Sequence, residues 1–177
     1  MTYFKNYRCS ECGKEFPPDE LRYLCDDCSK NYYAGMPLRG ILECEYEYEA
    51  IARAWADLQR AFPDAHERKK MEELCELFSP VDKEYYPNLP VGCSPLLSTQ
   101  SLSGELLHLK FDGLNPSGSY KDRASHLVVA EAKRLGVREI VTASTGNAAS
   151  SLAAMCAPAG LKAVIFTPAA APQAKLV

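Results

Sequence analysis

Residues 139–167, EIVTASTGNAASSLAAMCAPAGLKAVIFT, decide the fold class of this 177-residue chain. Glu139–Ala143 and Lys162–Thr167 are short apolar runs of the kind that forms strands, and Pro168 ends the second one. Between them, Asn147–Ala157 is rich in alanine and serine and predicts a helix. Two strands joined through a helix form a crossover unit, which implies a parallel sheet covered by helices.

The same alternation extends upstream. Leu106–Phe111 predicts a further strand, and Tyr120–Leu135 predicts a helix with apolar residues on one face, stopped by Gly136. Residues 96–177 are therefore interpreted as a partial parallel α/β domain whose sheet holds all three strands.

The segment before this domain reads as helical and then extended. Ile51, Ala54, Trp55, Leu58 and Phe62 recur at helical spacing within residues 46–62. A second stripe follows within residues 64–78, so a helical hairpin is predicted; its members are Met71, Leu74, Cys75 and Phe78. Four prolines between 80 and 95 indicate an extended connector. The predicted organisation is a module at 1–35, a connector at 36–95 and the α/β domain at 96–177.

Two C-x-x-C pairs, Cys9–Cys12 and Cys25–Cys28, predict a metal site in the first module. Each pair places two thiolates at a tight turn, for which Gly13 is suited, and two facing turns give a closed tetrahedral zinc site. The alternative is four unrelated buried thiols. A closed site has no open coordination position, so the zinc would be structural and would hold together a ribbon with little core of its own. The other cysteines are interpreted as ordinary core or boundary residues: Cys44, Cys75, Cys93 and Cys156.

The composition is that of a soluble globular protein. Hydrophobic residues make up 47% and charged residues 24%, and the formal net charge of -3 gives no bias toward nucleic acid or an acidic ligand. No apolar run reaches the roughly 18 residues needed to cross a membrane, and the first residues are unlike a signal peptide. We therefore expect a cytoplasmic protein whose cysteines are thiols or metal thiolates.

Two loops lie just before predicted helices, where parallel sheets bind ligands. The first is Asn115-Pro116-Ser117-Gly118-Ser119-Tyr120-Lys121-Asp122-Arg123. The helix dipole disfavours an ammonium group at Lys121 and favours the neutral amine that can form an imine with an aldehyde cofactor. The alternative is an exposed surface lysine whose charge is held by Asp122.

The second loop, Ser144-Thr145-Gly146-Asn147, resembles an anion nest made of two hydroxyls, a glycine and the N–H groups of the next helix. Such a nest suits a carboxylate. A plain serine or threonine helix cap is the alternative.

Together the two loops resemble those of the fold-type-II pyridoxal-phosphate enzymes, and among these the threonine synthases, in which an Asp-Arg pair also follows the lysine. The resemblance covers most of the chain, because many of these enzymes begin with a zinc ribbon. Three further segments are similar to segments of the family: Gly40–Tyr46, Gly92-Cys93-Ser94-Pro95-Leu96 and Ala143–Asn147. The implied fold is that of the tryptophan synthase β type.

The resemblance also implies roles. Lys121 would hold pyridoxal 5'-phosphate covalently and shuttle protons, and Asn147 would hydrogen-bond the ring oxygen of the cofactor. Ser144, Thr145, Gly146 and Asn147 would hold the carboxylate of a small phosphorylated amino acid. The reaction implied is that of a lyase of threonine biosynthesis, in which O-phosphohomoserine and water give threonine and phosphate.

Three mild departures from the family pattern are Ser117 in place of threonine, Tyr120 in place of phenylalanine, and Ala148 in place of a hydroxyl residue. The last of these would weaken binding of the substrate carboxylate and leaves room for cysteate synthase or another replacement or elimination enzyme. The family's glycine-rich phosphate loop would lie beyond Val177. We therefore expect a truncated form, a broken gene product or one part of a split enzyme that binds the cofactor poorly alone. A homodimer and a missing carboxyl-terminal half are both left open.

A non-catalytic function is the competing hypothesis, in which the zinc ribbon contacts nucleic acid or a partner protein. The ribbon carries Arg8, Lys14, Arg22 and Lys30, but it carries more acidic residues than basic ones. No basic face is implied, so we expect no nucleic-acid partner.

Overall fold

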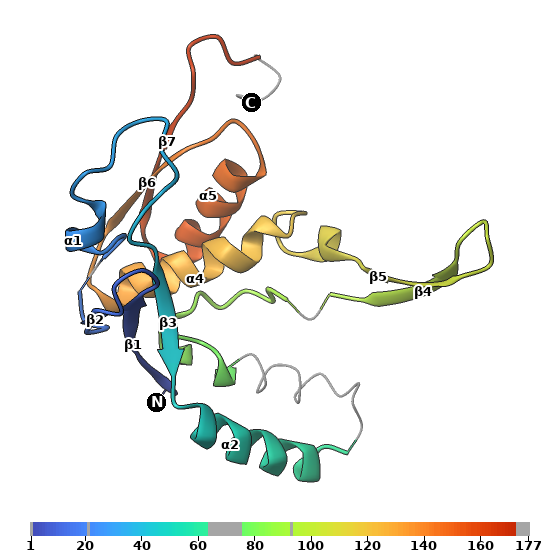
Figure 1. Cartoon of the computed structure of the whole chain (residues 1–177). Coiled ribbons are helices and arrows are strands. Elements are labelled where there is room, and N and C mark those ends of the chain that lie inside the picture. The colour runs from blue at the N-terminus through green and yellow to red at the C-terminus, as the bar shows by residue number, and fades with distance from the viewer. Residues whose placement is uncertain (1, 21, 64–75, 93, 173–177) are drawn as a thin grey trace. The chain divides into compact units, whose positions relative to one another are not determined.

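The computed structural model describes residues 2–20, 22–63, 76–92 and 94–172. The chain divides into two compact units, Met1–Asp82 and Lys83–Val177, and its helices and strands confirm an α/β protein (Figure 1). The division falls inside the segment assigned above to a connector, so the boundaries at 35 and 95 stay a prediction. None of the helices in the described ranges has the length and apolar character that a membrane span requires.

The first unit is built on a small antiparallel sheet. Strand β1 (Phe4–Cys9) lies between β2 (Glu15–Phe16) and β3 (Leu42–Tyr46), and the short helix α1 (Asp26–Ser29) follows β2 in the chain. The buried cluster and the half-buried residues around it are Cys9, Phe16, Cys25, Tyr7, Cys28 and Leu42. Three of these six residues are cysteines, so apolar burial by itself gives this sheet little stability.

Helix α2 (Tyr48–Ala61) confirms the first predicted helix and ends just before Phe62 and Pro63. Ile51 is buried, but Trp55 remains 39% exposed, so the described residues cover only part of the apolar stripe. The second stripe lies mostly in 64–75, outside the described residues, as do Cys75 and Cys93. The helical hairpin therefore stays a prediction.

The second unit contains the crossover predicted from residues 139–167. Strands β6 (Glu139–Ala143) and β7 (Lys162–Phe166) pair in parallel, and helix α5 (Asn147–Ala159) connects them. Helix α4 (Lys121–Arg134) packs against α5. Their shared core is Val129, Leu152, Met155 and Cys156, surrounded by half-buried apolar residues that include Ile140 and Ala163 from the two strands.

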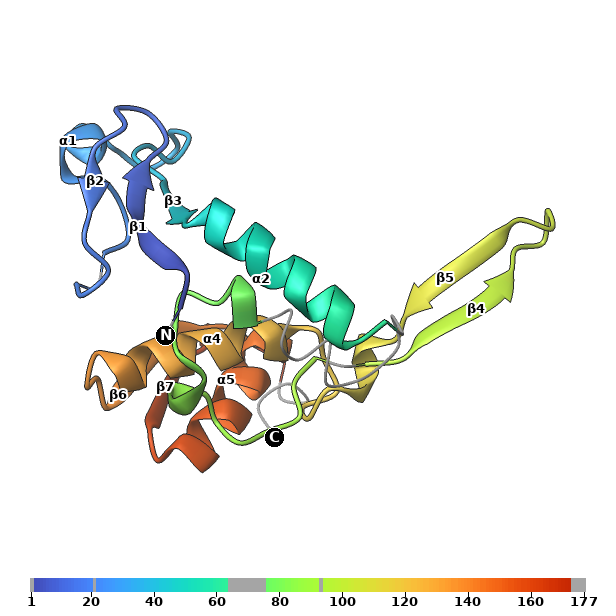
Figure 2. The ribbon, with the colours of Figure 1, turned by 90° about the horizontal axis from the view of Figure 1, so that it is seen from below.

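The prediction that Leu106–Phe111 joins the parallel sheet is wrong. Strand β5 (Leu106–Lys110) pairs antiparallel with β4 (Leu96–Gln100), a strand that the sequence reasoning missed, and this hairpin projects away from the helices of its unit (Figures 1 and 2). The turn between them is short, with Gly104 at φ +85°. Adjacent strands joined by a short turn pair locally, whereas parallel pairing needs a long crossover.

The second unit also contains two single turns of 3-10 helix, η1 (Lys83–Tyr85) and η2 (Asp112–Leu114). The second of these follows β5 and leads into the loop before α4.

Candidate functional site

The loop before α4 is held in shape by its first residue, Asn115, which is 4% exposed. The side-chain oxygen of Asn115 accepts a hydrogen bond of 3.0 Å from the N–H of Gly92, and its amide nitrogen donates one of 2.9 Å to the carbonyl of Asp112. The N–H of Gly118 then donates to the carbonyl of Asn115 at 2.8 Å. Gly118 has φ +78°, a left-handed conformation that side chains other than glycine adopt at a cost.

Lys121 is the first residue of α4, as the sequence predicts, and its side chain is half-buried. The backbone N–H of Lys121 donates to the hydroxyl of Ser119 at 3.1 Å, and Ser119 is itself buried. The Lys121 amine lies 4.9 Å from the centre of the Tyr120 ring. The lysine is therefore positioned by a fixed backbone, with an aromatic face beside its amine.

Asp122 does not hold the charge of Lys121, which was the alternative drawn from the sequence. Its carboxylate is fully buried and accepts two hydrogen bonds from Ser117, one from the backbone N–H at 2.7 Å and one from the hydroxyl. Within the part of the chain that the structure describes, no ion pair joins Asp122 to Lys121. The carboxylate closes the loop instead.

Arg123 anchors the start of α4 to the segment after β5. Its guanidinium donates two hydrogen bonds of 2.8 Å to the two carboxylate oxygens of Asp112 and one of 3.3 Å to the hydroxyl of Ser94. Ser94 also donates to Asp112. The Arg123 guanidinium, followed by the Ser94 hydroxyl, holds the pKa of Asp112 well below its usual range. Sequence reasoning missed Asp112 and Ser94, because nothing local in the sequence pairs them with Arg123.

The second loop precedes α5, whose N-cap residue is Gly146 in an extended conformation. The hydroxyl of Ser144 accepts a hydrogen bond of 3.2 Å from the N–H of Gly146. No side chain caps the first turn of α5 in the described residues, so the plain helix-cap alternative does not hold. A Cβ added at Gly146 would meet nothing within 4 Å, so the space in front of this glycine is open.

One buried polar contact joins α4 and α5 one turn after the first residue of each helix. The hydroxyl of Ser151 donates to that of Ser125 at 2.8 Å. Lys121 precedes Ser125 by four residues, and Asn147 precedes Ser151 by four, so each lies one turn away on the same helix face. Lys121 and Asn147 thus begin two helices that are hydrogen-bonded to each other one turn further along.

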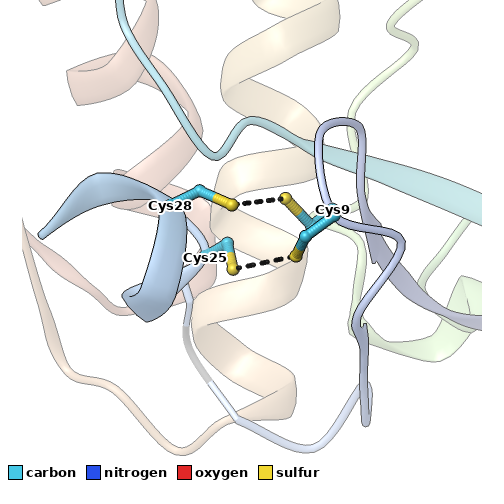
Figure 3. Close-up of side chains that lie close together, drawn as sticks. Cys9, Cys25 and Cys28 are labelled. Atoms are coloured by element: carbon cyan, nitrogen blue, oxygen red, sulfur yellow. Dashed lines mark hydrogen bonds between the residues drawn. The ribbon is translucent and has the colours of Figure 1, made fainter.

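The four predicted metal ligands also come together. The sulfur atoms of Cys9, Cys12, Cys25 and Cys28 all lie within 4.8 Å of one another, so the alternative of four unrelated thiols is wrong. The Cys9–Cys28 and Cys12–Cys25 sulfur distances are 3.8 Å and 3.7 Å, and the close-up shows the two cysteine segments facing each other (Figure 3). Zinc–sulfur bonds of about 2.3 Å in a tetrahedron place sulfurs about 3.8 Å apart, so the geometry fits zinc. Cys44 is exposed and Cys156 is buried in the helical core.

Bringing four thiols together has an electrostatic consequence. The backbone N–H of Cys12, more than any other group, lowers the pKa of Cys9 to about 7. The neighbouring Cys12 side chain, more than burial, raises the pKa of Cys28 to about 12. Loss of the proton is therefore favoured at Cys9 and opposed at Cys28, because thiolates close together repel one another. A divalent cation bound between them would remove this repulsion.

Gly40 supports the cysteine segments from outside. Its φ is +73°, and a Cβ there would lie 3.0 Å from the Cys25 carbonyl oxygen. The Gly40 carbonyl accepts a hydrogen bond of 2.8 Å from the N–H of Cys25, and its N–H donates at 2.8 Å to Glu11. Glu11 is in turn paired with Arg39 at 2.6 Å. Gly40 therefore ties the segment before β3 to both cysteine pairs.

Residues 88–177 match the model of a family described as pyridoxal-phosphate dependent enzyme. Among curated proteins, the chain is 31% identical over 166 residues to a threonine synthase of Methanosarcina acetivorans, a match that covers 92% of this chain and 36% of that relative. It is 34% identical over 166 residues to a threonine synthase of Methanocaldococcus jannaschii, covering 91% and 37%. A threonine synthase of a Bacillus species is 45% identical over 100 residues, covering 49% and 28%. The chain thus spans 36–37% of the length of the first two relatives.

Proposed function

The chain belongs to the family of pyridoxal-phosphate-dependent enzymes, and from this premise we propose that it contributes the lysine-bearing part of a threonine synthase. The proposed reaction converts O-phosphohomoserine and water into threonine and phosphate. The observation that carries the proposal is the setting of Lys121, a half-buried lysine at the first residue of α4, on a backbone fixed by Ser119 and Asp122.

The residues around Lys121 fit covalent attachment of the cofactor. The amine of Lys121 lies 4.9 Å from the centre of the Tyr120 ring, so the lysine that would bond to the cofactor has an aromatic face beside it. Bound pyridoxal phosphate supplies an electron sink for breaking the carbon–oxygen bond. Lys121 would hold it and move protons at the substrate carbons.

The loop before α5 would bind the substrate and orient the cofactor. Asn147 would donate to the cofactor ring oxygen, and Ser144, Thr145, Gly146 and Asn147 would hold the substrate carboxylate. The open space in front of Gly146 and the absence of a side-chain cap on the described first turn of α5 support this role. The residues that bind the phosphate of the cofactor would come from a part of the enzyme that corresponds to the unmatched length of the relatives.

We also propose that Cys9, Cys12, Cys25 and Cys28 hold a structural zinc ion. The sulfur spacing supports a tetrahedral site, and the small apolar core of this sheet supports a need for one. Four protein ligands leave no position for a substrate, so the ion would stabilise and not catalyse.

The cofactor assignment is tested by titrating the purified chain with pyridoxal phosphate and recording the absorption band of the lysine-bound cofactor. We expect a band that stays well below saturation at equimolar cofactor and is lost in Lys121→Ala. A band that Lys121→Ala leaves unchanged would refute the assignment. A stoichiometric band in the unaltered chain would show that the expected weak binding is wrong.

The substrate is tested by adding O-phosphohomoserine or O-phosphoserine to the cofactor-bound protein, supplied together with the carboxyl-terminal part of a relative. A threonine synthase releases phosphate from the longer amino acid. Release from O-phosphoserine alone would favour the alternative, cysteate synthase or another β-replacement enzyme.

The charges of the first unit argue against the nucleic-acid alternative. All four basic residues in question are paired with carboxylates: Arg8 with Glu45, Lys14 and Lys30 with Asp27, and Arg22 with Asp26 and Glu20. A basic surface that recognises phosphates would need cations whose charge is not neutralised by neighbouring carboxylates. Salt-sensitive binding of DNA or RNA would reverse this argument.

A further inference from the structure

Asp122 is the one residue of the lysine loop whose charged side chain is wholly inaccessible to solvent in the described residues, with an exposed fraction of 0%. Burying a carboxylate is costly unless it is hydrogen-bonded, so such a residue needs a structural or functional reason. The proposed function gives it no part in binding the cofactor or the substrate, since it is neither the lysine nor part of the substrate loop.

The hydrogen bonds of Asp122 enclose Lys121. Its carboxylate accepts from the backbone N–H and the hydroxyl of Ser117, which closes the loop from 117 to 122 into a ring. Inside this ring, the hydroxyl of Ser119 accepts from the N–H of Lys121 at 3.1 Å. The N–H of Asp122 itself donates to the Ser119 carbonyl at 3.2 Å. The backbone of Lys121 is thus fixed from both sides by hydrogen bonds that do not involve its side-chain amine.

A carboxylate suits this position for two reasons. It lies in the first turn of α4, where the helix dipole favours a negative charge. Its two oxygens can also accept the two Ser117 donors at once, which an alanine or a hydroxyl side chain cannot do.

We propose that Asp122 is a positioning residue, which sets the direction in which Lys121 presents its amine to the cofactor by clamping Ser117. This inference rests on the proposed function. Asp122 does not touch the amine, so its effect is on geometry and not on proton transfer.

The clamp can be separated from the charge by two substitutions. Asp122→Ala removes both acceptors. Asp122→Asn keeps one oxygen for the N–H of Ser117, and its amide can donate to the Ser117 hydroxyl, whose oxygen can accept. The asparagine variant should therefore preserve the ring, and the alanine variant should open it.

The experiment treats the folded chain with excess pyridoxal phosphate, reduces with borohydride, and maps the labelled lysines by mass spectrometry. Lys162, which is 70% exposed, is the internal reference, and Asp57→Ala on the exposed face of α2 is the matched control. Amide hydrogen exchange is followed in the same samples at Ser117, Lys121 and Leu152. Leu152 reports whether the helical core remains folded.

We expect labelling of Lys121 relative to Lys162 to fall by about tenfold or more in Asp122→Ala, as for a misplaced reacting group, and to stay within about threefold in Asp122→Asn and Asp57→Ala. Exchange at Ser117 and Lys121 should accelerate only in Asp122→Ala, with Leu152 still protected. Unchanged labelling in Asp122→Ala, with or without faster exchange, would overturn the positioning role, and so would an equal loss in both variants. A wild-type chain that labels Lys121 no faster than Lys162 would overturn the cofactor role itself, and this inference with it.

Discussion

The hydroxyl of Ser151 in α5 donates a hydrogen bond of 2.8 Å to the hydroxyl of Ser125 in α4, in a core otherwise formed by Val129, Leu152, Met155 and Cys156. Ser151 is 0% exposed and Ser125 is 8% exposed. If one helix shifted along the other, the two hydroxyls would separate and remain unpaired in an apolar core. This hydrogen bond therefore sets the register between the helices that begin with Lys121 and Asn147.

The serine pair should show strong energetic coupling. Ser125→Ala leaves a buried donor without its partner and should lower the free energy of unfolding by about 1–2 kcal/mol, and Ser151→Ala should have a similar effect. The double variant should lower the free energy of unfolding by less than the sum of the two single effects, because it leaves no unpaired hydroxyl in the core. Urea unfolding at equilibrium measures all three. Ser150→Ala, on the exposed side of α5, is the control and should change stability by less than about 0.5 kcal/mol. Additive effects would contradict the coupling.

Zinc should be present and should matter to one part of the chain. We expect about one zinc ion per chain in protein purified without chelator, lost in Cys12→Ser and on addition of a strong chelator. Loss of zinc should expose the amides of β1 and α1 to hydrogen exchange, while those of α4 and α5 stay protected. Cys44→Ser is the control, since Cys44 is exposed and lies outside the cysteine cluster. Protein that folds normally without stoichiometric zinc would refute the assignment.

Gly40 should be less replaceable than Gly13, although both have φ +73°. Alanine at either site adopts an unfavourable left-handed backbone, at a cost of about 1–2 kcal/mol. At Gly40 the new Cβ would also lie 3.0 Å from the Cys25 carbonyl oxygen, whereas at Gly13 it would meet nothing within 4 Å. We therefore expect Gly40→Ala to destabilise the first unit more and to weaken zinc retention in a chelator competition. Equal effects of the two variants would show that the contact with Cys25 is unimportant.

The ion pair of Arg123 with Asp112 should make the free energy of unfolding depend on pH in the acidic range. The pKa of Asp112 is lowered in the folded state, so its contribution is present above its unfolded pKa of about 3.9 and is lost as the pH falls toward the folded value. Arg123→Gln should lower the urea midpoint at pH 7, and its difference from the unaltered chain should shrink below about pH 4. Arg138→Gln, at an exposed arginine of the same unit, is the control. A difference that stays constant down to pH 3 would contradict the ion-pair explanation.

Several features of the fold could be predicted from residues that are close in sequence. The apolar spacing of 121–134, the stop at Gly136 and the runs on either side of 147–159 specify α4, β6, α5 and β7 within a few residues. The two C-x-x-C pairs likewise identified a thiol cluster, because each pair needs only one local turn. Ser117, Tyr120 and Ala148 departed from the family pattern, and the described loop still forms around Lys121.

Other features of the fold depend on contacts between residues whose pairing cannot be read from the sequence. Residues 106–110 are strand-like in themselves, but whether they join β6 and β7 or fold back on 96–100 depends on which edge is available, and the short turn at Gly104 settled it. Asp122 reads as a possible ion-pair partner of Lys121 until Ser117 is seen to occupy both of its oxygens.

The sequence by itself determined helices α2, α4 and α5, the crossover strands β6 and β7, the family, and the two residue sets to which we assign chemistry, the lysine loop and the cysteine pairs. Only the tertiary structure decided how Lys121 is held, through Ser117 with Asp122, Arg123 with Asp112, and Ser125 with Ser151. The physical reason is that helix and turn formation depend on neighbours in the chain, whereas the partner of a buried polar group is chosen by packing between segments.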